Sequence, residues 1–400
     1  MLKTTVIVAA ILGNVFAAVL PLQKLAVQGI DAHIPLSESG LALQGFRLIA
    51  TAPTTASWMS EEEILALKRQ EIGFMDITNQ DIERVDHHLT SLSASALPEQ
   101  YAPPKKISHK NVVTPLFDQI SIPGLISFLT QFSAFHTRYY QSVTGAQSAD
   151  WLFEQVNSIK AADPSKVKVT VRKFLHPFGQ FSTIARLERG ADSENIAEPI
   201  VILGAHQDSA NGANPLFGRA PGADDDGSGT VTILEAYRIL IQSSFVPDRP
   251  IEFHWYAAEE GGLLGSQAIA AKYKFDNVNV AGMYQVDMTG YSPQGRKPRI
   301  AVITDYVDHS LTDFVRLIAR EYTGIDVVDS QCGYACSDHG SWSKANYASA
   351  FTFESEFNKK SPFIHTVQDT VENVNFEHVA HFVKSVLGFA VELSLAKEGF

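Results

Sequence analysis

V-I-L-G-A-H-Q-D-S, residues 201–209, is the first of three stretches that decide the fold. The second is P-G-A-D-D-D-G-S-G-T at 221–230, and the third is I-E-F-H-W-Y-A-A-E-E at 251–260. The first and third are apolar runs typical of buried strands, and each ends in charged or imidazole side chains. Because functional groups in an open α/β sheet gather beyond the carboxyl ends of its strands, these stretches predict a site at one edge of a sheet.

Strands and helices alternate over most of the chain, which predicts an α/β fold with a mostly parallel central sheet covered by helices on both faces. The expected strands are 167–174, 182–187, 199–205, 251–257, 280–286, 300–304 and 348–353. The expected helices lie within 122–159, with a second helix there from 149, and at 230–243, 263–273, 311–322 and 376–396. We therefore expect one large domain.

The N-terminal region differs from the rest of the chain. A basic residue, an apolar run and small residues up to Ala18 are typical of a secretory signal peptide at residues 1–18. Residues 19–85 carry a helix capped by Ser60 but no cluster of metal-type ligands, so we interpret them as a pro-segment. The alternative is an N-terminal subdomain that stays attached. The main domain then spans residues 86–400.

Composition narrows the classes of partner. The 400 residues carry a formal charge of −12, and 45% of them are hydrophobic. The negative charge argues against a nucleic-acid surface, and it suits a protein that handles metal ions or substrates with a free amine. No run after the signal peptide reaches the ~20 apolar residues of a membrane span. We therefore expect neither a nucleic-acid partner nor membrane insertion.

The chain has two cysteines, Cys332 and Cys336, in the sequence C-G-Y-A-C. In a reducing compartment they would be two free thiols. In the oxidising compartment that a signal peptide implies, we expect them to form a disulfide that closes a small loop.

Ligand-type residues follow two of the predicted strands. His206 closes the first strand, and Asp208 is near enough in sequence to accept the second ring N–H of a metal-bound imidazole. Glu259 and Glu260 follow the other strand, and neighbouring residues there point in different directions. One glutamate can therefore bind a metal ion while the other takes a proton from water as a general base.

Three adjacent aspartates, Asp224, Asp225 and Asp226, lie between glycines on the connecting loop. The alternative to a metal site is a solvated turn, but a carboxylate that bridges two cations offsets the repulsion. Spacing alone does not say which aspartate bridges. Single candidates follow at Asp287 and His365. The resulting ligand set is His206, one of the three aspartates, Glu260, Asp287 and His365, with His339 as an alternative ligand. Such a set gives two zinc ions three protein ligands each and leaves positions open for water and substrate.

These motifs resemble those of the zinc aminopeptidases of peptidase family M28. They are H-x-D, P-G-A-D-D-D-x-S-G, A-A-E-E-x-G-L-x-G-S, D-M-T, C-G-Y-A-C-S-D-H and I-H-T-x-Q-D-T, and the resemblance extends from about residue 120 to the C-terminus. It implies that Asp225 bridges two zinc ions. It also implies that His206 and Asp287 complete one site, and that Glu260 and His365 complete the other.

The resemblance also assigns roles beside the metal ligands. Glu259 matches the family's general base, and Asp208 matches the carboxylate that orients the first histidine. Tyr334 matches a residue whose hydroxyl assists the reacting carbonyl. The peptide bond between Asp225 and Asp226 is expected to be cis, and His339 is not a ligand in the family pattern.

An apolar specificity pocket is implied in the same way. The matching residues are Met288, Ile303, Cys332, Tyr334, Cys336, Phe351, Phe353, Phe357 and Ile364. Such a lining favours a large aliphatic or aromatic first residue in the substrate. The alternative is that some of them, Phe351 and Phe353 in particular, are ordinary core residues.

The sequence therefore predicts a secreted, extracellular zinc aminopeptidase, made as a zymogen. We expect it to act as a monomer on peptides with a free N-terminus and to prefer leucine or another large apolar first residue. Three alternatives remain. They are a glutaminyl cyclase that uses a single zinc ion, a carboxypeptidase of similar architecture, and a non-catalytic, receptor-like relative.

Overall fold

The computed structural model describes residues 41–78 without 43, 53 and 71, residues 102–190, and residues 199–397 without 294. The chain divides into two units, Met1–Phe46 and Arg47–Phe400, and every element described below belongs to the second unit. The predicted signal peptide and the predicted boundary near residue 85 lie outside the described residues. Among the described helices none alone has the length and apolar content of a membrane span, although one bent pair, Lys110–Gln119 with Ile122–Phe132, meets that test.

An eight-stranded mixed sheet forms the centre of the second unit, in the order β10-β9-β11-β8-β6-β7-β5-β4. The strands are β4 (Val167–Phe174), β5 (Ser182–Arg189), β6 (Ile200–His206), β7 (Ile251–Tyr256), β8 (Val280–Val286), β9 (Arg299–Ile303), β10 (Asp326–Ser330) and β11 (Ser349–Phe353). The four central strands, β11, β8, β6 and β7, are parallel to one another, and antiparallel pairs flank them. The predicted α/β sheet is confirmed, and its parallel centre is the part that carries the site.

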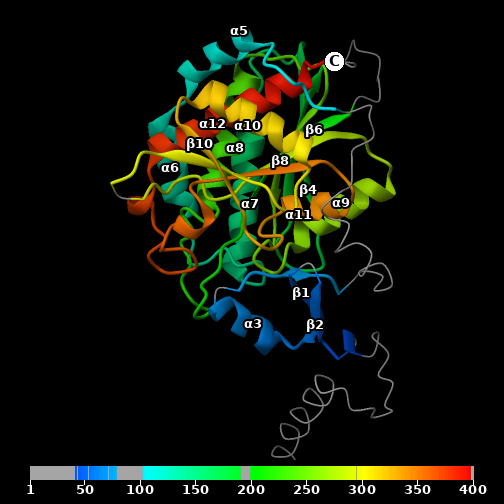
Figure 1. Ribbon diagram of the computed structural model, residues 1–400, viewed down its shortest axis with the longest axis vertical. Helices are drawn as coiled ribbons and strands as arrows, with labels where there is room; N and C mark the ends of the chain where they lie inside the picture. The colour runs from blue at the N-terminus through cyan, green and yellow to red at the C-terminus, as the bar shows by residue number, and fades with distance from the viewer. Residues whose placement is uncertain are drawn as a thin grey trace, which may run out of the picture. The chain divides into compact units, whose positions relative to one another are not determined.

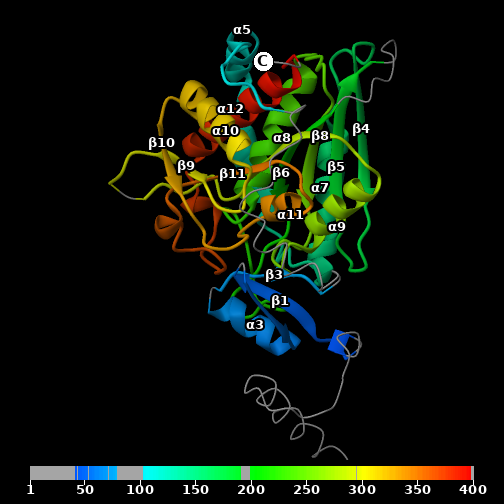
Figure 2. The ribbon, with the colours of Figure 1, turned by 45° about the vertical axis from the view of Figure 1, so that its right-hand side comes forward.

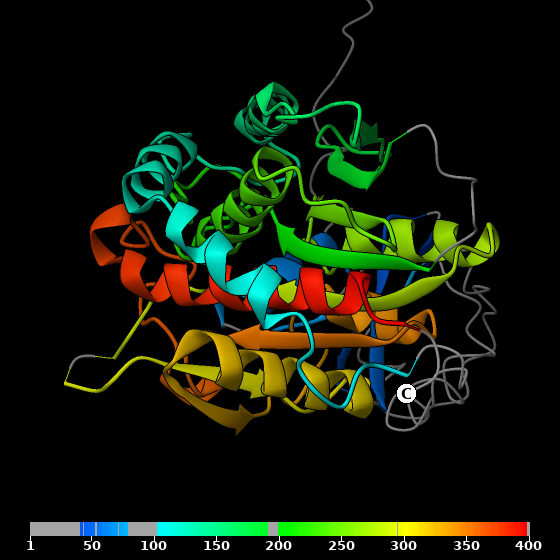
Figure 3. The same cartoon turned by 90° about the horizontal axis from the view of Figure 1, so that it is seen from above.

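Helices cover both faces of this sheet (Figures 1 and 2). One layer contains α8 (Gly227–Gln242), α10 (His309–Thr323) and α12 (Phe376–Ser394), and the other contains α9 (Leu264–Phe275) and α11 (His339–Lys344). Figure 3 shows α10 (yellow) and α12 (red) side by side along the sheet.

Alternation along β6 explains the two helix layers. Leu203 packs into the core with α8 and α12, whereas its neighbour Ile202 packs into the core with α9 and α11. Successive strand residues point to opposite faces, so a strand that is apolar throughout has to be covered on both sides. All seven residues of β6 are buried, as the continuous apolar run predicts.

One of the helices before the sheet begins earlier than predicted. The region 122–159 forms α6 (Ile122–Phe132) and α7 (Val143–Ser158), and α7 starts six residues earlier than the predicted 149. Ser142 sets this start, because its side chain accepts the N–H of Gly145 and caps the helix. Shorter elements are α5 (Lys110–Val113), η3 (Thr114–Gln119), η4 (Phe357–Lys359) and η5 (Val371–Asn373).

A small antiparallel sheet precedes the main domain. It consists of β1 (Arg47–Ala52), β2 (Thr55–Met59) and β3 (Met75–Asp76) in the spatial order β2-β1-β3. The helix α3 (Glu61–Arg69) connects β2 to β3. The predicted capping box is present: Ser60 accepts the N–H of Glu63, and the Glu63 carboxylate accepts the N–H of Ser60. This segment, residues 47–78, belongs to the predicted pro-segment.

Candidate active site

The carboxyl ends of the parallel strands bring the predicted ligands together. His206 is the last residue of β6, Asp287 follows β8 directly, and Glu260 lies in the turn after β7. Asp225 lies on the loop before α8, and His365 lies between β11 and α12. Since the four central strands run parallel, their ends meet at one edge of the sheet.

Several residues at this edge have left-handed backbone conformations. The φ angle is 56° at Ala258, 58° at Met288 and 57° at His365, and none of these residues is glycine. Such conformations cost of order 1 kcal/mol or more each and concentrate at functional sites, where the surrounding structure holds them. Each lies at or directly beside a predicted ligand or base.

Asp225 belongs to two groups of metal-type ligands. Its Oδ1 lies 3.1 Å from Nε2 of His206, which is also 3.6 Å from Oδ1 of Asp287. Its Oδ2 lies 3.0 Å from Nε2 of His365, which is 3.2 Å from Oε2 of Glu260. Each group of three offers ligand atoms within 4.8 Å of one another. The Asp225 carboxylate therefore presents one oxygen to each group.

These distances suit zinc. With metal–ligand bonds of 2.0–2.1 Å and tetrahedral angles, ligand atoms on one zinc ion are separated by about 3.3 Å. The distances from the two imidazole nitrogens lie around this value, and Oε1 of Glu260 is buried without a hydrogen-bond partner among the described residues. A buried carboxylate oxygen without a partner is costly unless a cation binds it. The donors present therefore fit two metal ions that share Asp225.

Charge within this cluster is unusually dense. Burial alone would raise the pKa of Asp225, but contacts with the two imidazoles hold it well below its ordinary value. Burial likewise opposes ionisation of Glu260, but His365 and Lys68 lower its pKa to about 2. Burial would lower the pKa of His206, and the surrounding carboxylates, Asp287 first, raise it well above the ordinary value. The carboxylates thus favour positive charge beside them, from a protonated imidazole or from a bound cation.

The three adjacent aspartates have three different environments. Only Asp225 faces the two histidines. Oδ1 of Asp226 accepts the N–H of Gly229 at 2.8 Å and caps α8. Oδ1 of Asp224 accepts the N–H of Gly290 at 2.9 Å and braces the loop. The peptide bond Asp225–Asp226 is cis, as the family resemblance implies.

Two buried carboxylates hold the backbone that carries the ligands. Asp208 accepts the N–H groups of Glu259 and Glu260 at 3.0 and 3.1 Å, and its Oδ1 lies 3.4 Å from Nδ1 of His206. The contact with His206 is long for a hydrogen bond, whereas the two backbone contacts are of ordinary length. Asp208 is therefore placed to orient the glutamate pair as well as the histidine predicted for it.

Like Asp208, the Asp226 carboxylate accepts two backbone N–H groups at or beside ligand residues. Its Oδ2 accepts the N–H of His206 at 3.1 Å, and its Oδ1 accepts the N–H of Met288 at 3.0 Å. The Ser337 hydroxyl donates to Oδ2 of Asp287 at 2.6 Å, which leaves Oδ1 of Asp287 to face His206. In the group of His206, Asp225 and Asp287, the backbone of His206 and the side chain of Asp287 are therefore both held by hydrogen bonds.

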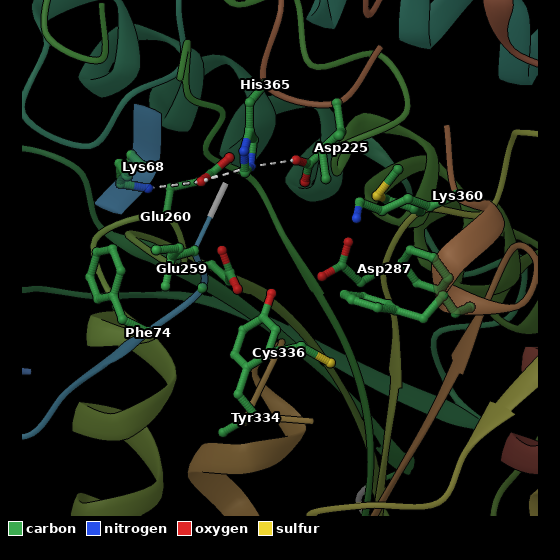
Figure 4. Close-up of a pocket in the computed structure, with 18 residues that line it drawn as sticks. Lys68, Phe74, Asp225, Glu259, Glu260, Asp287, Tyr334, Cys336, Lys360 and His365 are labelled. Atoms are coloured by element: carbon green, nitrogen blue, oxygen red, sulfur yellow. Dashed lines mark hydrogen bonds and ion pairs between the residues drawn. The ribbon is translucent and has the colours of Figure 1, made fainter. Parts of the chain in front are cut away.

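Glu259 and Tyr334 point into the pocket beside the two ligand groups (Figure 4). Burial, followed by nearby charges that include Glu260, shifts the pKa of Glu259 well above its ordinary value. Burial raises the pKa of Tyr334, so its hydroxyl remains protonated and can donate a hydrogen bond. Both side chains thus face the ligand groups, and their roles as general base and hydrogen-bond donor stay predictions.

The pocket has an apolar wall. Of the predicted pocket residues, Met288, Tyr334, Cys336, Phe353, Phe357 and Ile364 line it. Ile303 and Phe351 are fully buried behind this wall in the same apolar cluster, so they shape the pocket without lining it. Cys332 and Cys336 form the expected disulfide. Lys360 also lines the pocket, and its ammonium lies 4.7 Å from the centre of the Phe357 ring.

The segment that precedes the main domain also contributes to this pocket. Lys68 is 7% exposed, and its Nζ donates to Oε2 of Glu260 at 3.0 Å. Burial alone would lower the pKa of Lys68. Glu260 and the neighbouring carboxylates outweigh this effect, so the pKa lies above its ordinary value and the ammonium stays charged. The backbone of Gly73 lies so close to the Tyr334 ring that a Cβ at this position would be 1.9 Å from Cε2 of Tyr334. Both Glu260 and Tyr334 are therefore contacted from this segment.

Backbone contacts fix the same segment on the turn after β7. The N–H of Asp76 donates to the carbonyl oxygen of Gly262 at 3.1 Å, and Nε2 of Gln267 donates to the carbonyl oxygen of Asp76 at 2.8 Å. The Arg47 guanidinium donates to the carbonyl oxygen of Gly261 at 3.3 Å. Residues 47–78 thus pack onto the turn that carries Glu259 and Glu260.

Two other buried histidines, His339 and His254, lie outside the ligand groups. His339 is fully buried, stacks on Phe351 with ring centres 4.8 Å apart, and is in neither ligand group. His254 is fully buried in β7, and its Nε2 contacts Oε2 of Glu252 at 2.8 Å. Both are packed within the core, and His339, the alternative ligand of the sequence, belongs to neither group.

Sequence reasoning missed several residues of the site. Lys68 and Gly73 carry no local signal, because their roles arise from packing against residues far along the chain. Arg138 is another: its fully buried guanidinium donates to the carbonyl oxygens of Gln207, at 2.8 Å, and Gly222, at 2.8 Å. It thereby joins the loops that carry His206 and Asp225.

Comparisons with known proteins agree with this site. Residues 182–390 match the model of peptidase family M28. Leucine aminopeptidase 1 of Blastomyces gilchristii is 45% identical over 358 residues, which cover 87% of this chain and 89% of that protein. Leucine aminopeptidase 1 of Coccidioides posadasii is 42% identical over 380 residues, covering 92% and 94%. The crystal structure of the Legionella pneumophila LapA aminopeptidase has a TM-score of 0.73 at 28% identity, covering 88% of this chain and 98% of that one.

The fold and these similarities define a peptide hydrolase. The chain belongs to peptidase family M28. The family and the donor set indicate zinc as the metal.

Proposed function

We propose that the protein is a secreted aminopeptidase that removes a large apolar residue, leucine above all, from the N-terminus of peptides. The observation that supports this most strongly is the sharing of Asp225 by two histidine-carboxylate groups beside Glu259 and an apolar pocket. The names of the relatives agree with this activity. A peptide with a free N-terminus is the proposed substrate, and the monomer is the proposed form.

The chain's own residues supply most of the proposed chemistry. When bound, two zinc ions supply Lewis acidity and lower the pKa of water. Glu259 takes a proton from the attacking water and passes it to the leaving amine. The Tyr334 hydroxyl donates a hydrogen bond to the carbonyl oxygen as negative charge develops on it. Met288, Phe353 and Ile364 bind the apolar side chain of the first residue.

The contact of Lys68 supports recognition of an amine. Its ammonium lies 3.0 Å from Glu260 within the pocket, so the pocket can hold an alkylammonium group beside the ligand cluster. A free N-terminus carries the same kind of charge. We therefore propose that the carboxylates around Glu260 select substrates whose first residue has an unblocked amine.

Residues 19–85 are proposed to form a pro-segment that keeps the precursor inactive. Its described part places Lys68 on Glu260 and Gly73 on Tyr334, which are two groups that the reaction needs. A substrate cannot occupy the same positions while these contacts persist. Removal of this segment after secretion is therefore proposed to expose the site.

A panel of aminoacyl chromogenic substrates tests the proposal. The processed protein is expected to release leucine fastest, to lose activity with a chelator, and to recover it with zinc. Acetylation of the substrate's amine is expected to abolish cleavage. Cleavage of the blocked substrate from its carboxyl end would show a carboxypeptidase instead, and cyclisation of N-terminal glutamine without release of amino acids would show a glutaminyl cyclase.

A further inference from the structure

Asp369 is a buried carboxylate at the junction of two loops that carry ligands. It lies four residues after His365 and is 2% exposed. Its Oδ1 accepts the N–H of Asp224 at 2.8 Å, and its Oδ2 accepts the N–H of Asp225 at 3.0 Å. The Asp369 carbonyl oxygen accepts the N–H of Ala223 at 3.1 Å. Asp369 therefore holds three consecutive residues that lead to the shared ligand.

The two ligand groups depend on this residue unequally. Each group has supports of its own: Asp226 binds the N–H of His206 and Ser337 binds the Asp287 carboxylate in the first group, and Asp208 binds the N–H of Glu260 in the second. The second group needs Oδ2 of Asp225 near Nε2 of His365, and these atoms are 3.0 Å apart. Asp369 connects the His365 loop to the backbone of Asp225, so it sets this separation directly.

We propose that Asp369 is a positioning residue that sets the metal affinity of the group formed by Asp225, Glu260 and His365. The inference rests on the proposed two-metal site. An asparagine at position 369 keeps the shape of the side chain but offers one acceptor and one NH2 group. The NH2 group then faces a backbone N–H, and two donors repel each other in a buried place. The backbone at Asp225 has to shift, and its Oδ2 moves relative to His365.

Zinc titration of double variants separates the two groups. His206→Gln leaves the group with Glu260 and His365 as the better site, and His365→Gln leaves the group with His206 and Asp287. Asp369→Asn is then added to each, in the full chain, after the metal has been stripped. Partners outside the ligand shell typically change metal affinity 10–100-fold. We expect a loss in this range when Asp369→Asn is combined with His206→Gln, and a change of at most about threefold when it is combined with His365→Gln.

Glu392 provides a matched control. It is 1% exposed, and like Asp369 it accepts two consecutive backbone N–H groups, those of Ser108 and His109, at 3.0 and 2.8 Å. Glu392→Gln breaks the same kind of contact near the C-terminal end of α12 without touching a ligand loop. It is expected to lower the melting temperature while zinc affinities stay unchanged. A merely structural role for Asp369 would give the same pattern in Asp369→Asn.

The outcomes separate this inference from the proposed function. Equal losses in both double variants, or no loss in either, would overturn the positioning role. If Asp369→Asn does not fold, Asp369→Glu replaces it and the same inequality is expected. Failure of both to fold with zinc, while Glu392→Gln folds, would also count against the inference. Fewer than two zinc ions in the unmodified chain would instead overturn the two-metal site itself.

Discussion

Replacement of Lys68 by methionine is expected to release the active site in the full-length chain. The Lys68 ammonium and the Glu260 carboxylate are both buried and 3.0 Å apart, with side-chain exposures of 7% and 3%. Removal of one partner of a buried ion pair costs about 3–5 kcal/mol. Even the lower value, ~3 kcal/mol, changes an equilibrium by about 100-fold, since ~1.4 kcal/mol corresponds to a factor of ten. The fraction of precursor with an open site should rise by that order.

The assay is hydrolysis of a leucyl chromogenic substrate by precursor whose processing has been blocked. Activity is expressed relative to the processed protein, which has the site fully open. Arg69→Met is the matched control, because Arg69 lies on the same helix but is exposed. Gly73→Ala is an independent variant, since its Cβ would be 1.9 Å from the Tyr334 ring and would push the segment away.

The expected order is clear. Lys68→Met and Gly73→Ala precursors should be much more active than the unmodified precursor, and Arg69→Met should equal it. If both variants stayed as inactive as the unmodified precursor, the contacts at Glu260 and Tyr334 would not be what closes the site.

Further expectations concern catalysis, pH and metal. Glu259→Gln should lower kcat by two or more orders of magnitude with the metal content unchanged, by analogy with the 10²–10⁴-fold contribution of general bases, and elemental analysis with kinetics checks this. Tyr334→Phe should lower kcat about 10²-fold with little change in KM, as loss of one oxyanion donor does. Burial lowers the pKa of Lys344 to about 7, although Asp76 of the proposed pro-segment acts in the opposite direction, and the Lys344 amine lies 3.9 Å from the sulfur of Met75. When the pro-segment is bound to the main domain, the Lys344 amine prefers its neutral form. Binding of a separately added pro-segment should therefore weaken as the pH falls from about 10 to about 7. Lys344→Met should flatten this pH dependence. Removal of zinc should lower the melting temperature, and restoring zinc should raise it, because a ligand that binds the folded state stabilises it.

The sequence was informative where a pattern is local. The run from Val201 to His206 is apolar throughout, and the structure buries all of β6 between two helix layers. Ligand-type residues directly after such strands had to lie at one edge, since parallel strands end together. That geometry brought His206 and Asp287 together although they are far apart along the chain.

What the sequence could not settle depends on tertiary contacts. Asp224, Asp225 and Asp226 have the same side chain, and only backbone direction decides which one faces both histidines. Lys68 acts through its contact with Glu260, 192 positions away, so no periodicity reveals it. Asp369 stood within the quoted motif I-H-T-x-Q-D-T, but its role depends on two backbone N–H groups that a sequence does not display.

The most direct test of the central claim is anomalous diffraction at the zinc edge from crystals of the purified protein. Two peaks about 3.5–4 Å apart are predicted. One should lie among His206, Asp225 and Asp287 and the other among Asp225, Glu260 and His365. A single peak in fully active protein, or two peaks that do not share Asp225, would contradict the account.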